Sequence, residues 1–428
     1  MGFLEDYDAL SAQGAPPETV AQQQMGLLQT WLLGKPDALF AELRANRPIF
    51  PTPGPILITR YRDVVETLEY NQIFSVGPWG EAMRRNNDGP NFVLGMEDSP
   101  EYRHEISILR LAVRWEDADS IAAFTAQTAQ TLAAQLAAKG TFDITDGYAR
   151  LIPTLFIGFY FGVPGPDPTT LMGWARQIFH DIFFNLTSDP QVRANAQTAA
   201  KALRDYNQSL IDQAHADQQA GKPLADNVLG RLITMQCAAP SAFPDDRVRE
   251  NLSGCIDGVI DNVCTAIVNA LDVLFAHPDQ LPGAIAAAQA DNDALLLRYV
   301  LEALRFRVPA PLLFRFTLAD HVLARDTPRQ TTIPAQKLIF VSTASAMMDE
   351  ADLDNPQGFD LNRPMTDYIH FGWGLHECLG KYLATGLIVQ GVKSLLRLKG
   401  IRRADGLAGV LTYDGPFPVS FSVTCDPT

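Results

Sequence analysis

Residues 245–276 form the longest stretch of the sequence with the pattern of a single helix. Pro244-Asp245-Asp246 is typical of a helix start, and His277-Pro278 ends the pattern. At about 1.5 Å per residue, such a helix is about 50 Å long. Its middle, GCIDGVIDNVCTAIVNALDVLF, is apolar on most faces, which indicates burial on all sides. The chain must therefore fold around a helix that crosses its core.

Length and composition indicate a large globular protein. The chain has 428 residues, and at about 150 residues per domain this length predicts about three domains, although one large single-core enzyme also fits. The 47% apolar and 19% charged fractions exclude a disordered chain. The net charge of −15 opposes binding to nucleic acid and to anionic membranes.

The ends of the chain and its cysteines predict a cytoplasmic protein. The sequence contains no run of about 18 consecutive apolar residues, so we expect no membrane anchor. The start, MGFLEDYDAL, carries acids where a signal peptide carries basic residues. The five cysteines are odd in number and unclustered, which argues against a disulfide framework or a CxxC zinc pair. One cysteine can still carry the chemistry.

The remaining sequence predicts a mainly α fold with a minor β part. We expect the first helix at Pro36–Asn46, a strand within 55–61, a helix at 62–70, and a long functional loop at 71–95. Further helices are expected at about 99–115, 117–138, 146–163, 167–186, 189–220, 226–236, 279–290, 292–307 and 378–398. The helical part is therefore about 99–308 and 378–398, and the β-rich parts are about 48–61, 312–341 (strands at 312–318 and 331–341) and 399–424. Because the β-rich parts come from both ends of the chain, we expect one interleaved domain over 1–428.

The most specific motif is FGWGLHECLG at residues 371–380, just before the last predicted helix. Backbone N–H groups and the helix dipole stabilise a thiolate at a helix N-terminus, so Cys378 is a candidate metal ligand. A lone thiolate suits haem iron, because it pushes electron density onto the iron. The neighbouring glycines allow the backbone to approach a flat partner closely. The other four cysteines are better explained as inert core residues.

This loop resembles the haem-binding signature of the cytochrome P450 family, F-x-x-G-x-H-x-C-x-G. All of its positions match, namely Phe371, Gly374, His376, Cys378 and Gly380. The resemblance implies a soluble, bacterial-type P450 fold in one large domain. It also implies haem b (iron protoporphyrin IX) between the long central helix and the Cys-loop helix, with Cys378 on the iron. The default oligomeric state of the family is a monomer, so the resemblance also implies a monomer.

Further residues match the family at the expected spacing. Glu302 and Arg305 match its structural E-x-x-R pair, and Arg363 is our candidate for the residue linked to them; alone, the pair would be an ordinary surface ion pair. Arg315 and His376 match haem-propionate contacts. For the third contact, Tyr102 and Ile106 replace the family's His and Arg. His104 and Arg103 are candidates to compensate, although a solvated helix face explains Arg103 equally well.

The resemblance places the catalytic residues at the middle of the long helix. Counting back from Pro278 puts Asp261-Asn262 where the family usually carries an acid–alcohol pair, with Gly258 opening the groove. Asn262 replaces the Thr, and Thr265 lies one turn on. Asn does not titrate but can hold a peroxide, hydroxyl or water. Two mechanisms follow: monooxygenation with O2, in which Asp261 supplies protons through water, or peroxide-based chemistry (a hydroperoxide isomerase, dehydratase or peroxygenase). The Asn at position 262 is also compatible with a neutral substitution that has no effect on the chemistry.

The pocket and partner are predicted from position. Apolar residues expected to line the pocket imply a hydrophobic or amphipathic small molecule, although each is equally compatible with a core position: Trp79, Phe92, Val259, Leu312, Leu313, Phe314 and Phe417. Arg103, Arg110 and Arg114, with Lys381, form a candidate basic patch for an acidic ferredoxin, or ordinary solvated charges. A hypothesis of another class is a non-catalytic haem sensor or carrier-interacting module.

Overall fold

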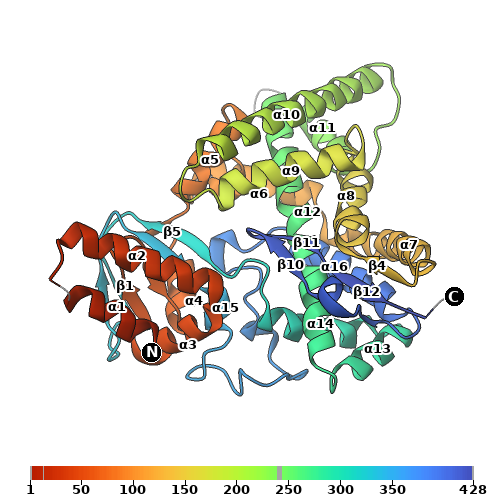
Figure 1. The fold of residues 1–428 in the computed structure, drawn as a ribbon. Helices are drawn as coiled ribbons and strands as arrows, with labels where there is room; N and C mark the ends of the chain where they lie inside the picture. Colours follow the sequence, from red (N-terminus) through yellow and green to blue (C-terminus); the bar gives the residue numbers. More distant parts are fainter. Residues whose placement is uncertain (1, 13, 239–242, 427–428) are drawn as a thin grey trace. The chain divides into compact units, whose positions relative to one another are not determined.

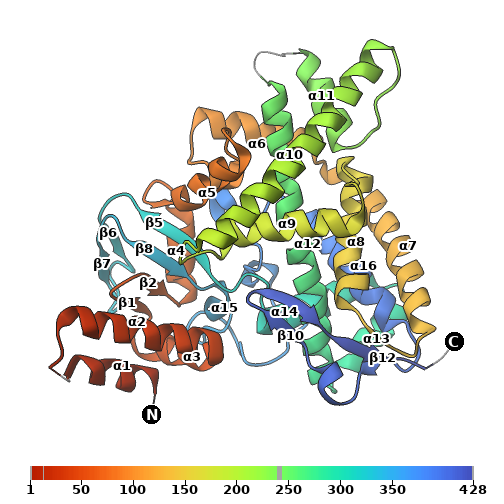
Figure 2. The ribbon, with the colours of Figure 1, turned by 45° about the horizontal axis from the view of Figure 1, so that its top comes forward.

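The computed structural model describes residues 2–12, 14–238 and 243–426, which group into two compact units. The sheet unit comprises Met1–Pro78 and Arg305–Cys378, and the helical unit comprises Trp79–Leu304 and Leu379–Thr428. Both units therefore combine sequence from the two halves of the chain. The expectation of a single domain over 1–428 stays a prediction, and each unit is described here on its own (Figures 1 and 2).

The sheet unit is built on a five-stranded sheet with the order β1-β2-β8-β5-β3. Strands β2 and β8 are parallel, whereas β1–β2, β8–β5 and β5–β3 are antiparallel. A separate hairpin joins β6 and β7. The unit's elements are α1 (Phe3–Ala12), α2 (Pro17–Gly34), α3 (Pro36–Asn46), β1 (Ile49–Pro51), β2 (Ile56–Ile58), α4 (Tyr61–Glu69), β3 (Phe74–Ser75), β5 (Leu313–Thr317), β6 (His321–Leu323), β7 (Thr331–Ile333), β8 (Leu338–Val341), α15 (Thr343–Ala346), and the 3₁₀ turns η5 (Met365–Asp367) and η6 (Gly374–His376).

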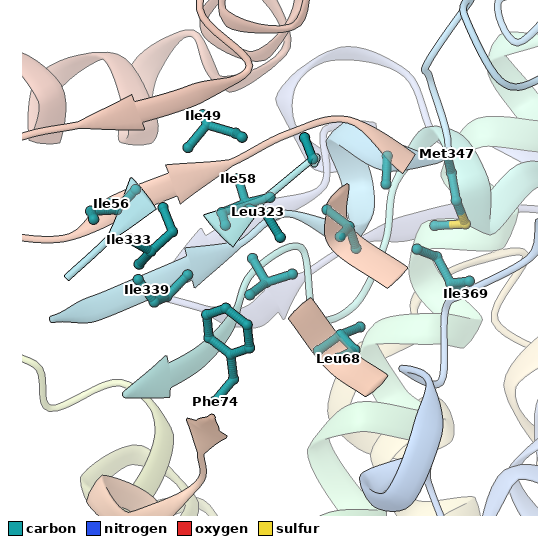
Figure 3. Packing of buried hydrophobic residues seen from close by; sticks show 14 of the residues in the cluster. Ile49, Ile56, Ile58, Leu68, Phe74, Leu323, Ile333, Ile339, Met347 and Ile369 are labelled. Carbon is teal, nitrogen blue, oxygen red and sulfur yellow. The ribbon is translucent and has the colours of Figure 1, made fainter. Parts of the chain in front are cut away.

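Alternation along the strands gives this sheet two apolar faces. In β2, Ile56 and Ile58 pack into one cluster and Leu57 into another, as the two-residue period of a strand requires. The first cluster reaches α4 and Ile369, which lies just before the Cys loop (Figure 3). The second cluster lies under α1, α2 and α3. The sheet therefore has a buried core on both of its faces.

The helical unit is built around α12. It contains α5 (Gly77–Asn87), η1 (Val93–Gly95), α6 (Pro100–Ala112), η2 (Trp115–Asp117), α7 (Ala118–Ala137), β4 (Thr141–Asp143), η3 (Thr145–Arg150), α8 (Leu151–Phe156), η4 (Ile157–Phe161), α9 (Pro168–Phe183), α10 (Pro190–Gln219), α11 (Val228–Ala238), α12 (Asp245–Ala276), α13 (Leu281–Gln289), α14 (Asp293–Phe306), α16 (Lys381–Leu396), β9 (Arg402–Arg403), η7 (Gly406–Gly409), β10 (Thr412–Asp414), β11 (Phe417–Ser420) and β12 (Ser422–Thr424). Strands β4-β12-β9 form one small sheet and β10-β11 another. Helix α5 begins, and α14 ends, within the residues of the sheet unit.

Helix α12 has the predicted bounds and packs against α9, α10 and α16. Figures 1 and 2 show α9 and α10 side by side along part of its length. In the described part of the chain it is the one helix long and apolar enough to cross a membrane by length and composition. However, 78% of its most apolar window is buried inside the structure. That burial is the pattern of a core helix.

Three helix starts share one local signal, a capping residue followed by proline. The Ser99 hydroxyl accepts the Tyr102 N–H, and Asp167 and Asp189 cap α9 and α10 in the same way. A side-chain oxygen at this position satisfies an N–H that has no partner within the helix, and proline suits the first helical residue. The sequence therefore places the starts of these three helices to within one residue.

Several expected elements were wrong. Two helices, α1 and α2, precede Pro36, and the expected loop at 71–95 contains α5 and η1. The Gly and Pro at the start of α5 and the Asn residues at its end conceal an eleven-residue helix. The 146–163 helix is interrupted by the π-helical turns η3 and η4. The 331–341 strand is split by Gln336, whose φ of 60° breaks the extended backbone.

Candidate functional site

The Cys loop, residues 371–378, ends with an exposed, unbridged thiol at Cys378. Its backbone is closed on itself, because the Cys378 N–H donates to the Phe371 carbonyl at 2.9 Å and the Glu377 N–H donates to the Gly374 carbonyl. Helix α16 begins at Lys381 with Gly380 as its N-cap, so the expected helix start at residue 378 was wrong by three residues. Cys378 still directly precedes a helix N-terminus in the chain.

Helix α4 supports this loop from within the sheet unit. The Trp373 indole N–H donates to Glu69 at 3.1 Å. Gly374 has a φ of +73°, and a Cβ added there would lie 2.8 Å from the Leu68 carbonyl oxygen. Gly372 has a similar φ of +78°, but a Cβ there would meet only ordinary contacts at 3.7 Å or more. Gly374 is thus required by the approach of α4, a reason that the sequence analysis did not identify.

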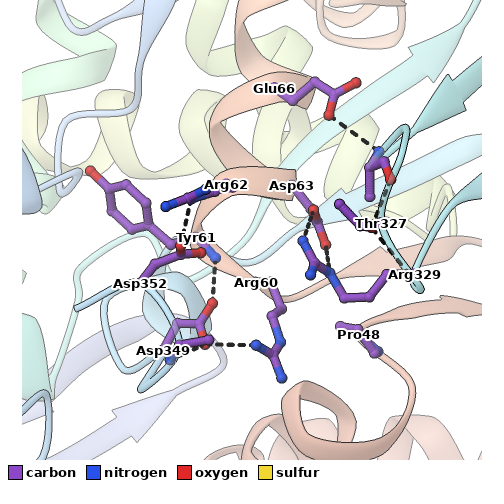
Figure 4. Close-up of polar contacts among 12 residues, drawn as sticks. Pro48, Arg60, Tyr61, Arg62, Asp63, Glu66, Thr327, Arg329, Asp349 and Asp352 are labelled. Atoms are coloured by element: carbon purple, nitrogen blue, oxygen red, sulfur yellow. Dashed lines mark hydrogen bonds and ion pairs between the residues drawn. The ribbon is translucent and has the colours of Figure 1, made fainter. Parts of the chain in front are cut away.

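Hydrogen bonds and ion pairs along α4 fix its position (Figure 4). At its first turn, the Tyr61 N–H donates to Asp349 at 3.0 Å, and Arg62 pairs with Asp352 at 2.5 Å. In the same turn, buried Asp63 receives two hydrogen bonds from Arg329. One turn on, Glu66 accepts the Ala324 N–H at 3.2 Å. These contacts join α4 to segments after β6 and β8. The Cys loop therefore rests on a helix that is tied down along its length.

Glu302 and Arg305 on α14 are both completely buried, so an ordinary surface ion pair is excluded. The Arg305 guanidinium donates to the carbonyls of Met347 (3.1 Å), Pro356 and Gly358 (2.7 Å). Arg363, also buried, donates to the Asp354, Asn355 and Gly358 carbonyls. The two arginines thus share the Gly358 carbonyl as an acceptor, and the structural role expected for Glu302, Arg305 and Arg363 stays a prediction.

The four residues expected to contact haem propionates differ in exposure. Arg315 is buried in β5 and donates to the Phe314 carbonyl at 2.8 Å, whereas His376 is half-buried in η6. On α6, Tyr102 is buried, and burial raises the pKa of its hydroxyl. His104 on the same helix is exposed. Of the two α6 candidates, Tyr102 therefore has the more enclosed position, and the propionate roles of all four stay predictions.

Asp261 lies on the buried side of α12 with an exposed fraction of 3%. One of its oxygens, Oδ1, forms an ion pair with the Arg176 guanidinium of α9 at 2.7 Å and lies 3.2 Å from Nε of Arg150 in η3. These two arginines escaped the sequence analysis because they are distant along the chain. Asp261 is therefore a paired anion within the helical unit.

The least buried side of the middle of α12 is a narrow strip, which we call the open strip, of one exposed and four half-buried residues: Gly258, and Gly254, Cys255, Val259 and Asn262. Gly258 is exposed, and a Cβ added there would meet no atom within 4 Å. The Asn262 amide donates to the Gly258 carbonyl at 3.0 Å. Thr265 is buried and donates to the Asp261 carbonyl. The structure thus places Asn262, rather than Thr265, on this strip.

Three of the expected pocket residues are buried aromatic side chains of the helical unit. Trp79 and Phe92 are each 8% exposed. Phe92 packs directly onto Gly254, since a Cβ there would overlap its ring. Phe417 contacts Phe179 and His180 of α9 and Phe184, which follows α9 directly. The Arg176 guanidinium lies over the Phe417 ring. Phe92 therefore lies against the open strip.

The other pocket candidates on β5 lie in the sheet unit and diverge. Leu313 lies beside the Cys loop, because a Cβ at Gly372 would be 3.7 Å from its Cδ1 atom. Leu312 and Phe314, on the opposite face of β5, pack against the cluster under α1, α2 and α3. Strand alternation therefore separates Leu313 from its two neighbours.

The expected basic patch is only partly formed on one helix. Arg103 and Arg110 are exposed on α6, and Arg103 pairs with Asp98 at 2.9 Å. Helix α6 ends at Ala112, so Arg114 lies beyond it, against the prediction of a 99–115 helix. Lys381 is exposed at the start of α16. The exposed indole of Trp115, which packs against the Tyr382 ring in a tilted arrangement, lies beside Arg114 in the chain.

Comparison with known proteins decides the family. The family model for Cytochrome P450 matches residues 171–397, more than half of the chain. The chain belongs to the cytochrome P450 family. It is a family of haem-thiolate monooxygenases, and the cofactor of this P450 is haem b. The expected fold class, mainly α with a minor β part, is confirmed as the P450 fold.

Relatives with assigned activities match most of this P450. It is 26% identical over 375 residues to the cyclomarin C epoxidase CymV of Salinispora arenicola, covering 84% of this chain and 88% of the relative. It is 25% identical to a bifunctional dioxygenase–epoxy alcohol synthase of Fusarium oxysporum, covering 90% of this chain but only 34% of that longer protein. Among solved structures, CalO2 superposes with a TM-score of 0.77 at 20% identity, over 92% of this chain and 96% of that one.

The residues present fit a haem. Cys378 offers an exposed, unbridged sulfur on a loop held in place by α4, and a cysteine thiolate of this kind would serve as the protein ligand of haem iron. Arg315 supplies a buried guanidinium of the kind that binds carboxylates. The donor set therefore agrees with the family's cofactor.

Proposed function

We propose that this P450 is a monooxygenase that oxidises a hydrophobic or amphipathic small molecule. It would use O2 and electrons from a ferredoxin-type partner, in the cytoplasm, with Cys378 as the iron ligand. The carrying observation is the exposed Cys378 thiol at the end of a complete F-x-x-G-x-H-x-C-x-G loop. The epoxidase activity named for the Salinispora relative agrees with oxidation of a small molecule.

When bound through a thiolate, haem supplies the oxygen-activating chemistry. The chain's own residues then bind and orient the reactants. The Asn262 amide nitrogen is bonded to Gly258, so its carbonyl oxygen is the group available to accept an O–H hydrogen bond on the open strip. Asp261 holds its charge between two arginines, and a proton passing through its carboxylate requires a change in those contacts.

A peroxide-based activity is the second candidate, and Asn262 favours it. An acceptor that does not titrate can hold the O–H of a hydroperoxide in one pose without delivering protons. A reaction in which the substrate brings its own O–O bond needs neither electrons nor a ferredoxin. The epoxy alcohol synthase activity named for the Fusarium relative is compatible with this route.

Two measurements test the proposal. The reduced, CO-treated holoprotein should give a Soret band near ~450 nm, and Cys378→Ser should lose it, because the thiolate is responsible for that band. A folded wild-type protein without this band would overturn the assignment of Cys378. Cys425→Ser is the matched control, since that thiol is buried and hydrogen-bonded to the Ala137 carbonyl.

A second experiment separates the two activities on one substrate panel. One arm supplies NAD(P)H, ferredoxin, its reductase and O2, and the other supplies hydroperoxides without a reductant. Turnover only with electrons supports monooxygenation and eliminates the peroxide route; turnover only with hydroperoxide has the opposite meaning. Product in neither arm, from a protein with the thiolate band, favours a haem sensor or a carrier-interacting module.

A further inference from the structure

Asp257, in the middle of α12, is a buried carboxyl group without a partner. Only 6% of the residue is exposed, and its Oδ1 atom accepts no hydrogen bond. No hydrogen bond or ion pair joins Asp257 to any other residue in the described ranges 2–12, 14–238 and 243–426. Burial raises the pKa of this carboxyl well above its usual value. A buried polar group of this kind destabilises the fold unless something satisfies it.

The other buried acids of α12 show what is missing. Glu250 accepts a hydrogen bond from Asn87 of α5, and Asp272 pairs with Arg403 of β9. Asp261, one turn after Asp257, receives Arg150 and Arg176. All three are therefore paired to another element. Asp257 is the exception among the four buried acids of this helix.

Asp257 borders the open strip. Gly254, at i−3, is its neighbour on the helix surface, and Gly258 follows it in the sequence on the same side; neither carries a side chain that could cover it. Beside Gly258 there is open space, since an added Cβ would meet nothing within 4 Å. On Gly254 lies the ring of Phe92. A carboxyl group next to open space and an aromatic ring is the combination that binds an organic cation.

We propose that Asp257 binds the cationic group of an amphipathic substrate and so determines which substrates this P450 accepts. The incoming cation gives Asp257 the charge partner that Arg150 and Arg176 give Asp261. It thereby favours the ionised carboxylate, the form that burial alone disfavours. Phe92 and Val259 contact the apolar part of the same molecule. This inference rests on the proposed function and adds a substrate class to it: small molecules that carry a basic nitrogen beside a hydrocarbon portion.

Binding of three ten-carbon probes to the holoprotein tests this, measured by calorimetry so that no turnover is needed. The probes are decyltrimethylammonium, 1-decanol and decanoate; the first has no nitrogen lone pair and cannot ligate iron. The wild type should bind the cation about tenfold or more tightly than the alcohol, since a desolvated charge–charge contact is worth at least that factor. Decanoate should bind most weakly.

Two isosteric variants locate the effect. Asp257→Asn should lose the preference for the cation and keep its affinity for 1-decanol. Glu250→Gln makes the same chemical change on the same helix, at a residue already bonded by Asn87, and should keep the preference. Retention of the preference in Asp257→Asn, or its loss in Glu250→Gln alone, overturns the assignment.

The order in which the wild type binds the three probes tests the proposal even if a variant does not accumulate as folded protein. Tightest binding of 1-decanol or decanoate to the wild type overturns the proposal without any variant. Failure here is also separable from failure of the proposed function. The first appears in the ranking of probes, and the second in a missing thiolate band or a missing requirement for electrons.

Discussion

Replacing Gly374 by alanine tests whether α4 determines the geometry of the Cys loop. The substitution has two costs in the structure. An alanine at a φ of +73° is strained, which costs about 1–2 kcal/mol for an L-residue in the left-handed region. Its Cβ would also lie 2.8 Å from the Leu68 carbonyl oxygen, a rigid backbone atom, and such overpacking costs about 1–3 kcal/mol. Together they predict a loss of about 2–5 kcal/mol.

Gly372→Ala is the matched control, because it carries the first cost without the second. Its φ is +78°, but the nearest atoms to an added Cβ are 3.7 and 3.8 Å away. We therefore expect Gly372→Ala to cost about 1–2 kcal/mol. The difference between the two variants measures the contact between the loop and α4.

Urea unfolding of both holoproteins, followed by circular dichroism, gives the loss of stability. The CO difference spectrum of the same samples gives the fraction of protein with an intact thiolate bond. Gly374→Ala should have the lower midpoint and the smaller thiolate band. Equal midpoints for the two variants would refute the role assigned to α4, because backbone strain alone would then account for both.

Three further substitutions test other parts of the structure. Arg305→Lys should lower the free energy of unfolding by about 2–4 kcal/mol, because a lysine leaves at least one of the buried Met347, Pro356 and Gly358 carbonyls without a donor. In urea titrations, the losses of stability in Arg305→Lys and Arg363→Lys should not add up in the double variant, because both arginines donate to the Gly358 carbonyl. Asp257→Asn should stabilise the protein at pH values above the carboxyl's ordinary pKa near ~4. Burial raises the folded-state pKa of Asp257, so the stability of the wild type should fall as the pH rises from the unfolded-state pKa toward the folded-state pKa, whereas the asparagine variant lacks this loss. If the free energies of unfolding of the wild type and the variant differ by a constant amount from acid to alkaline pH, the prediction is contradicted. Asn262→Thr should raise the ratio of product to NAD(P)H consumed if the enzyme uses electrons, and an unchanged ratio would count against Asn262 as the residue facing the reacting oxygen.

The parts of the fold that the sequence predicted well have strong local signals. Helix α12 is bounded by Pro244 and by His277-Pro278, and its bounds are correct as predicted. Helices α9 and α10 begin at capped Asp-Pro pairs. These signals act within one helical turn, so they are readable without knowledge of the tertiary structure.

The missed elements depend on distant partners. In α5, Arg85 and Asn86 are hydrogen-bonded to Asp181 of α9, and Asn87 to Glu250 of α12. Its sequence, GPWGEAMRRNN, has no apolar period strong enough to indicate a helix by itself. Tertiary contacts therefore override a weak local preference, and a single sequence does not show them.

The candidate site divides in the same way. The Cys loop and the Glu302–Arg305 spacing are contiguous motifs, and the sequence identified them. That Gly374 is needed against Leu68, or that Asp261 is paired to Arg150 and Arg176, depends on residues distant along the chain. Asp257 was visible as an acid in an apolar helix, but its lack of a partner is a property of the fold alone.

The paired acids of α12 also bear on the role of Asp257. Glu250, Asp261 and Asp272 connect the helix to α5, η3, α9 and β9, and together they fix its rotation about its own axis. A fourth acid is not needed to orient the helix, and an unpaired one only destabilises it. Because the rotation is fixed, Asp257 cannot turn away from the edge of the open strip to reach a partner or solvent. The position is therefore explained by what it binds rather than by what it holds in place, as expected where a site is maintained at a cost in stability.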